Sequence, residues 1–582
     1  MPELNYSRRD FISFAGLALA APAASAVPGI AGAPNRLSAA SAQEHLPAVA
    51  PGDAPATVEC LVFDANGDPL PPSALKVREL DRFHLCDLLM RPFTSPDVEE
   101  TAGSVRFTPP TDRPFRIAMP LDVPGFGRVF SYADDGGRGW TARSLAQASP
   151  LVLNYAFAKD RMATVRRMAA DCNRLGVVIS PETQRRIDTA QAALDRAEKA
   201  EADRATRVQE SMKSFGDSLY AGEMLVLARA QRAIANQFIR PGFLFGCDGF
   251  GLASGSPEVR HLFQKAFNYT TIPIYEGWVE KEKGRPDYSF FEGALDTLIS
   301  TTILAKGHPG IWLEPENTPK WLQNISYEET KRYCLEHVRQ AITRYRHRVH
   351  IWDVINEAHV QPETSRGMAG FTREQNVDLT VSALETAHAS DPTAFRCVNI
   401  TGTWADYYMS RNPAPWQQSP YDYLCMVRDA KAQYDAIGLQ YYHSGRDFVE
   451  WERDLESFHH FDKSIHITEI GFPSSLVPTA GEGRYALWGG GEGGEGMTWH
   501  REFTETTQAD YLEYLYTIAY SKPWVEAISW WDFNGVGHDG FLREDGVTPK
   551  EMYHRLLELR SKWRNTGIAR PEDTGASLPL SL

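Results

Sequence analysis

Between residues 239 and 565, eight short apolar runs alternate with longer polar or amphipathic stretches. Short runs rich in β-branched residues are typical of buried parallel strands, and the stretches between them are typical of the helices that cover such strands. Eight repeats over a segment of this length predict a closed (β/α)8 barrel. The predicted strands are 243–247, 269–275, 307–312, 349–355, 396–400, 437–441, 464–470 and 527–531.

Two of the predicted strands end near a glutamate. The fourth is followed by Asn-Glu, with Glu357, and the seventh contains Ile-Thr-Glu, with Glu469. A (β/α)8 barrel keeps its chemistry at the carboxyl ends of its strands. Two carboxyl groups there can flank a glycosidic bond, one as acid and the other as nucleophile. Taken alone, either glutamate would also suit a solvated position at a strand end.

Four motifs, spread over the barrel, resemble glycoside hydrolase family 10, the family of retaining endo-β-1,4-xylanases. They are Trp-Asp-Val-Ile-Asn-Glu-Ala at 352–358, Ile-Thr-Glu at 467–469, Gly-His-Pro-Gly-Ile-Trp at 307–312 with Thr-Pro-Lys-Trp at 318–321, and Gly-Phe-Leu-Arg-Glu-Asp-Gly at 540–546. The resemblance covers most of residues 239–565. It implies a TIM barrel that hydrolyses a β-1,4-linked polysaccharide, with xylan as the leading substrate and without a cofactor or metal.

The resemblance also implies a role for single residues. Glu357 would be the general acid/base and Glu469 the nucleophile. Asn356 would bind the 2-hydroxyl of the sugar that is cleaved, and His308 would bind the same sugar. A helix cap for Asn356 and a core position for His308 are the structural alternatives. Asp353 fits no simple alternation with its neighbours and is interpreted as structural.

The end of the sixth strand carries a further pair. Gln440 and His443 match a Gln and a His of the family, where the His orients the nucleophile, although the spacing Gln-Tyr-Tyr-His is one residue longer here. Tryptophans near the strand ends would wall the sugar pocket or pack the barrel. The remaining predicted substrate-binding residues are Trp530, Trp531, Trp312 and Asn268.

The chain departs from the family pattern where the family grips the non-reducing-side sugars. The family's Glu-Asn pair and Lys-Trp are replaced by the shorter segment 271–278, its second third-strand His by Leu313, and the Asp after its nucleophile by Gly471. The residues of the hydrolytic centre are kept, whereas the residues that bind the neighbouring sugars are altered. Two alternatives therefore stay open: the same mechanism on a different or decorated β-glycan or oligosaccharide, and a catalytically silent glycan-binding barrel.

The amino terminus predicts export. Residues 1–26 combine Arg8 and Arg9 with an apolar run and a small-residue cleavage site, which resembles a twin-arginine signal. Residues 27–55 are rich in Ala, Pro, Gly and Ser and are predicted to be a disordered linker. The mature protein is expected to be periplasmic or extracellular and to have no membrane span.

Three further regions are predicted from their patterns. Residues 56–150 contain short strand-like runs between Pro and Gly turns, which indicates a small β-sandwich that binds glycan or packs against the barrel. Residues 151–238 have helical periodicity, with a helix start at Ser180 and an interruption at Gly216, which indicates a helical hairpin connecting to the barrel at 239–565. Residues 566–582 are predicted to be a flexible tail.

Composition narrows the possible partners. The net charge of −15, with no stripe of Lys and Arg, excludes nucleic acid and anionic membranes as expected partners. The 14 Trp and 23 Tyr residues suit stacking on the rings of a polysaccharide or oligosaccharide. The seven cysteines are scattered singly, so neither a zinc site nor a disulfide framework is predicted. A monomer is expected.

Overall fold

The structure is a computed structural model. It describes residues 57–77, 80–81, 83–89, 91, 98–109, 113–314, 317–323, 325–359, 371–404, 418–442, 445–475, 497–534 and 539–566. The predicted signal segment 1–26, the linker 27–55, the tail from 567 onward and His443 lie outside the described residues. In the part of the chain that the structure describes, no helix is long and apolar enough to cross a membrane.

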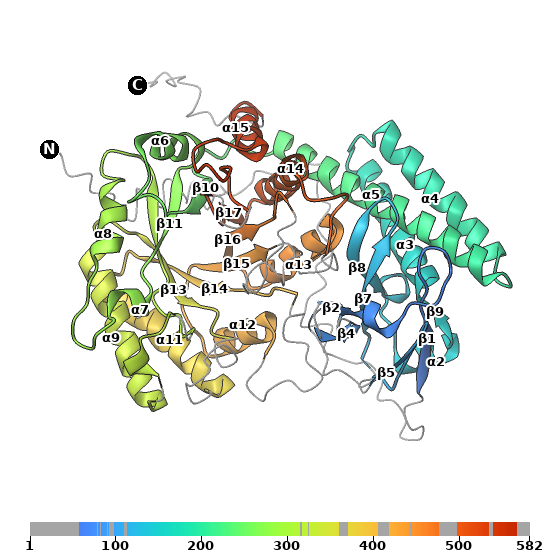
Figure 1. Cartoon of the computed structure of the whole chain (residues 1–582), viewed down its shortest axis with the longest axis horizontal. Coiled ribbons are helices and arrows are strands. Elements are labelled where there is room, and N and C mark those ends of the chain that lie inside the picture. Colours follow the sequence, from blue (N-terminus) through green and yellow to red (C-terminus); the bar gives the residue numbers. More distant parts are fainter. Residues whose placement is uncertain are drawn as a thin grey trace, which may run out of the picture.

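Within the described residues, eight parallel strands pair in chain order into a closed barrel, which confirms the predicted (β/α)8 fold (Figure 1). The third strand begins earlier than predicted and ends at His308, because Pro309 has no N–H to continue the ladder. The strands are β10 (Leu244–Asp248), β11 (Tyr269–Pro273), β12 (Leu304–His308), β13 (Ile351–Asn356), β14 (Phe395–Ile400), β15 (Ala436–Tyr442), β16 (Ser464–Gly471) and β17 (Val525–Trp530).

Helices cover the outside of the barrel, and most begin on a Ser, Thr or Asp whose side chain accepts a hydrogen bond from the first turn. Thr372 and Gln375 form a reciprocal capping box. The helices of this part are α6 (Pro257–Ala266), α7 (Glu276–Val279), α8 (Ser289–Asp296), η4 (Lys320–Leu322), α9 (Tyr327–Tyr345), α11 (Arg373–Ser390), α12 (Pro420–Asp429), α13 (Phe448–His459), α14 (Glu505–Ser521) and α15 (Glu551–Trp563).

The described part of the region before the barrel contains three small sheets, with strand orders β5-β6-β1-β9, β4-β7-β8 and β2-β3, beside the barrel in Figure 1. Their inward side chains belong to the same continuous hydrophobic core as the barrel's outer layer. The elements are β1 (Val58–Leu61), η2 (Pro72–Leu75), β2 (Lys76–Val77), β3 (Leu80–Asp81), β4 (His84–Cys86), β5 (Val98–Thr101), β6 (Ser104–Phe107), β7 (Arg116–Val123), β8 (Gly127–Ala133), η3 (Asp135–Gly137), α2 (Ala142–Ala148) and β9 (Leu151–Val152).

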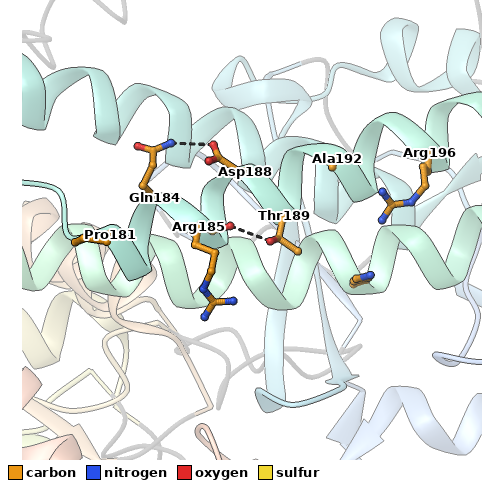
Figure 2. A pocket seen from close by; sticks show the side chains of 8 residues that line it. Pro181, Gln184, Arg185, Asp188, Thr189, Ala192 and Arg196 are labelled. Atoms are coloured by element: carbon orange, nitrogen blue, oxygen red, sulfur yellow. Dashed lines mark hydrogen bonds between the residues drawn. The ribbon is translucent and has the colours of Figure 1, made fainter.

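Three helices follow: α3 (Leu153–Arg174), α4 (Pro181–Lys199) and α5 (Arg204–Asn236). Ser180 caps α4 as predicted. The predicted interruption at Gly216 is wrong, because α5 runs through it without a break. Gly216 instead lets the helix approach β7: a Cβ there would lie 3.3 Å from the carbonyl oxygen of Pro124. A shallow hollow on the outer face of α4 and α5 is lined by residues of these two helices, most of them polar (Figure 2).

Buried charges join the amino-terminal region to the barrel. The Arg161 guanidinium of α3 donates to both carboxylate oxygens of Asp447, at 2.9 and 2.7 Å, and Arg116 of β7 donates to Glu450 at 2.9 Å. Glu223 of α5 accepts from the backbone N–H of Phe448 at 3.0 Å. Asp447, Phe448 and Glu450 all lie at the start of α13, which directly follows the loop after β15. The amino-terminal region therefore braces one segment of the barrel rim.

Candidate active site

Two register shifts decide which side chains point into the mouth of the barrel. Between β13 and β14 the pairing moves from Asp353 with Cys397 to Ile355 with Val398, so β13 has one extra residue. A bulge of this kind re-aims the side chains that follow it. Asp353 and Asn356 are three positions apart, yet both reach polar partners inside the barrel. This explains why no simple alternation is visible in the sequence.

The second shift lies between β15 and β16. Leu439 pairs with Ile467, but Gln440 pairs with Glu469, so Thr468 is the extra residue. The Thr468 hydroxyl donates to the side-chain oxygen of Asn399, at 2.5 Å. The bulge brings Gln440 and Glu469 side by side at the carboxyl ends of their strands, where a barrel of this kind carries its chemistry.

Glu357 lies just beyond the end of β13 and has a backbone φ of +54°. Residues other than glycine rarely adopt this conformation, and it concentrates at functional sites. The backbone N–H of Glu357 donates to the carbonyl of Asn399 at 2.9 Å. One carboxyl oxygen accepts from Gln440 Nε2 at 2.8 Å, and the other accepts from Trp312 Nε1 at 3.1 Å. The side chain is thus held at both oxygens.

Burial of this carboxyl, together with the negative charge of Glu469, raises the pKa of Glu357 to about 7. The donors Gln440 and Trp312 act in the opposite direction but are outweighed. A carboxyl group with this pKa is largely protonated below neutral pH and can act as a general acid.

Glu469 is only 5% exposed. One of its oxygens accepts from Asn399 Nδ2 at 3.2 Å, and the other accepts from the Tyr442 hydroxyl at 2.5 Å. His308 Nε2 lies 3.9 Å from the first oxygen. Each oxygen of the Glu469 carboxylate therefore accepts a hydrogen bond from a side chain of β14 or β15.

His308 is held by a buried ion pair. Burial alone would raise the pKa of Asp353, but the Lys306 ammonium at 2.6 Å and the hydrogen bond from His308 hold it at about 2. Asp353 is therefore ionised and accepts a hydrogen bond from His308 Nδ1 at 2.8 Å. The His308 Nε2 edge then faces Glu469. Asp353, interpreted from the sequence as structural, orients a predicted sugar-binding residue.

Asn356 lies among these groups. Its side-chain oxygen accepts from Asn399 Nδ2 at 2.8 Å and from Gln440 Nε2 at 3.3 Å. The structure thus brings together Glu357, Glu469, Asn356, Gln440, His308 and Trp312. Asn399 and Tyr442 also belong to this group and were not predicted. Asn399 lies in no recognised motif. The Gln-Tyr-Tyr-His spacing pointed to the end of β15 but not to Tyr442 itself.

Two predicted substrate-binding residues lie elsewhere. Asn268 precedes β11, and its side chain bonds to the backbone of Phe243 and Phe245 at the amino end of the barrel, opposite the glutamates. Trp530 is fully buried, contacts Tyr516 of α14 and donates to the carbonyl of Asp539 at 2.8 Å. Both predictions are wrong. The polar groups of these two side chains hydrogen-bond to the protein backbone instead of facing the glutamates.

Trp531 remains beside the site, with its ring 5.4 Å from that of His308. From there, contacting rings continue outward through Phe250 and Trp278, and Tyr275 joins Trp278 to Trp312. Trp278 is 38% exposed. An aromatic surface therefore extends from the glutamates towards solvent along β17, β10 and β11. Among the described residues, no three His, Cys, Asp or Glu side chains are grouped so as to hold a metal ion.

A family model described as Glycosyl hydrolase family 10 matches residues 236–536, more than half of the chain. The chain belongs to glycosyl hydrolase family 10. It is therefore an O-glycosyl hydrolase, and the family match covers the whole set of strands from β10 to β17. The matched segment also contains both glutamates and every side chain that contacts them.

Several proteins named as xylanases are similar to this chain. Endo-1,4-beta-xylanase B of Thermotoga neapolitana is 24% identical over 340 residues, which cover 55% of this chain and 88% of that protein. Endo-1,4-beta-xylanase 5 of Arabidopsis thaliana is 29% identical over 121 residues, which cover 20% of this chain and 21% of that protein. The crystal structure of native xylanase 10B from Thermotoga maritima aligns with a TM-score of 0.43 and 19% identity, over 58% of this chain and 98% of that one.

Proposed function

We propose that the protein hydrolyses β-1,4-xylan with net retention of the anomeric configuration. The observation that carries the proposal is the pair of glutamates at the carboxyl ends of β13 and β16, one with its pKa raised to about 7 and the other held by two donors. Xylan is supported by the names of the similar proteins, which are endo-1,4-beta-xylanases.

In the first step, one oxygen of Glu469 attacks the anomeric carbon of the sugar, and the bond from that carbon to the glycosidic oxygen breaks. The Glu357 proton moves to the departing oxygen, so a neutral alcohol leaves and a covalent glycosyl-enzyme forms. His308 Nε2 and Asn356 contact the hydroxyls of the sugar that carries the reacting carbon.

In the second step, the ionised Glu357 removes a proton from water as the water attacks the same carbon, and Glu469 leaves as a carboxylate. Gln440 and Trp312 contact the two Glu357 oxygens and hold this carboxyl in place in both of its protonation states. Two displacements at one carbon restore its original configuration.

The pKa of Glu357 gives an expected pH dependence. Below about pH 7 this carboxyl carries the proton that the leaving oxygen needs; above it, the rate on a natural oligosaccharide should fall about tenfold per pH unit. Glu357→Gln should remove this basic limb and lower kcat on the oligosaccharide by about 10²–10⁴-fold. The glycosylation rate on an activated aryl glycoside, which needs no proton, should change far less. If Glu357→Gln keeps the wild-type fall in rate at high pH, a group other than Glu357 causes that fall.

The aromatic surface replaces the polar side chains with which the family binds the neighbouring sugars. We expect Trp278→Ala to raise KM for long oligosaccharides by about tenfold, the effect of one lost aromatic contact. Turnover of a short aryl glycoside should be unchanged. Phe238→Ala is the matched control, because Phe238 is 50% exposed and follows α5. An equal effect of both variants would show that Trp278 does not contact substrate.

The altered residues at the sites of the neighbouring sugars also support a second candidate function. This is the same mechanism on a decorated xylan or on another β-glycan. One experiment separates the candidates: incubation with xylan, glucuronoxylan, arabinoxylan, mixed-linkage glucan and mannan, with chromatography of the products. Short xylo-oligosaccharides from plain xylan support the proposal. Products from another polymer only would show that this polymer, and not xylan, is the substrate. No products from any polymer would favour the silent glycan-binding barrel.

We also propose that the protein is a monomer exported by a twin-arginine signal. The support is residues 1–26, with their Arg pair, apolar run and small-residue site. Fractionation of cells carrying the wild-type chain or the variant with Arg8 and Arg9 both changed to Lys tests the export. Retention of the variant in the cytoplasm is expected, and equal export would refute the signal. Light scattering of the mature protein tests the monomer.

A further inference from the structure

Tyr442 and Gly471 form a pair that neither the motifs nor the family match assigns. They are register partners at the ends of β15 and β16, two residues beyond the pair formed by Gln440 and Glu469. Side chains two apart along a strand share a face. Tyr442 and Gly471 therefore face the same side as the site, and the Tyr442 hydroxyl reaches back to Glu469 at 2.5 Å.

The absence of a side chain at Gly471 is what admits the tyrosine ring. A Cβ at this position would lie 2.7 Å from Tyr442 Cδ1 and 3.2 Å from Tyr442 Cε1, and 3.1 Å from a carboxyl oxygen of Asp539. Gly471 is not among the glycines with positive φ, so its backbone does not require glycine. The close approach of the ring is the remaining reason for glycine here.

We propose that Tyr442 is the positioning residue of the nucleophile, and that Gly471 provides the space for it. The inference rests on the proposed role of Glu469. The hydroxyl donates to one carboxylate oxygen and fixes the rotation of the carboxylate, so that the other oxygen faces the anomeric carbon. A phenol keeps its proton throughout the range in which an imidazole titrates. The donor is therefore present at every pH at which Glu357 can act as an acid.

Tyr442→Phe removes the hydroxyl and keeps the ring. Because hydrogen bonds to charged groups are strong, we expect kcat to fall about 10–100-fold with KM nearly unchanged. The acidic limb of the pH profile should move to higher pH, because the ionised form of the nucleophile loses a donor. A wild-type rate and acidic limb in a folded Tyr442→Phe would overturn the proposal.

Gly471→Ala tests the second half of the inference without touching the hydroxyl. The added Cβ should displace the ring and reproduce both the lower kcat and the shifted acidic limb. The double variant should be no slower than the slower single variant, because both changes remove one interaction. Effects that multiply would show that Gly471 acts by another route. If Gly471→Ala does not fold, Tyr442→Phe still decides the role of the hydroxyl.

Tyr441→Phe is the matched control. Tyr441 is the preceding residue of β15, faces the other side and donates to Asp454 of α13 at 2.8 Å. Its loss should lower the melting temperature and leave the acidic limb in place. Glu469→Ala, measured in parallel, distinguishes failure of the proposed function from failure of the inference about Tyr442. If Glu469→Ala stays active, the proposed nucleophile is wrong. If Glu469→Ala is inactive while Tyr442→Phe is normal, only the inference about Tyr442 fails.

Discussion

Replacing Glu469 by alanine is expected to reduce hydrolysis on the order of 10⁵-fold or more, the scale seen when an enzyme loses a covalent nucleophile. Azide should restore turnover of an activated aryl β-glycoside, because a small anion fits the space left by the carboxylate and attacks the anomeric carbon. A single displacement inverts that carbon, so the product should be the α-glycosyl azide. Product configuration by NMR is the measurement.

The matched control for this variant is Glu357→Ala with the same substrate. There the nucleophile is intact, and azide should intercept the glycosyl-enzyme to give the β-glycosyl azide by two displacements. The two alanine variants should therefore yield opposite anomers. A folded Glu469→Ala that shows no rescue, or one that gives the β product, contradicts the assignment of the nucleophile.

Arg161→Met is expected to destabilise the whole protein by about 3–5 kcal/mol, because it leaves the carboxylate of Asp447 buried without its counter-charge. Asp447 is completely buried, and the pair is bidentate. Asp447 also caps α13, which follows the loop after Gln440 and Tyr442. Denaturant unfolding of the full chain measures the change in free energy.

Arg185→Met serves as the comparison, since its ion pair with Glu182 is exposed on α4 and should contribute little to stability. Restoring neutrality with Asp447→Asn in the Arg161→Met background should recover part of the lost stability. A loss below about 1 kcal/mol for Arg161→Met would mean that the amino-terminal region does not brace the barrel. The buried contacts favour the structural interpretation of this region over an independent glycan-binding module.

The barrel could be predicted from the sequence because most of its strands are short, mainly apolar runs that are buried on both faces. The same holds for the two glutamates, which occur in motifs at strand ends. Element boundaries depended on single residues: Pro309 ends β12, whereas Gly216 does not end α5, because helix packing outweighs the low helix propensity of glycine.

The contacts inside the site could not be predicted, because they depend on two bulges. An extra residue in β13 and Thr468 in β16 each change which side chains face the mouth, and a one-residue shift reverses the face of everything beyond it. The bulge in β13 explains why Asp353 shows no simple alternation with Asn356. Tyr442 shares the face of Gln440, two residues before it, but the resemblance to the family assigns its role to His443. Trp530 was misplaced for a related reason: adjacent residues of one strand face opposite sides, and the sequence does not show which of the two tryptophans faces the sugar.

We propose that Glu357 and Glu469 act by double displacement on a β-1,4-linked xylan chain. The most direct test is to follow the hydrolysis of xylo-oligosaccharides by proton NMR and record the anomer that appears before mutarotation. Double displacement predicts that the β-anomer forms first and that the α-anomer follows slowly by mutarotation. The α-anomer forming first would mean a single displacement by water, and would contradict the assignment of Glu469 as a nucleophile.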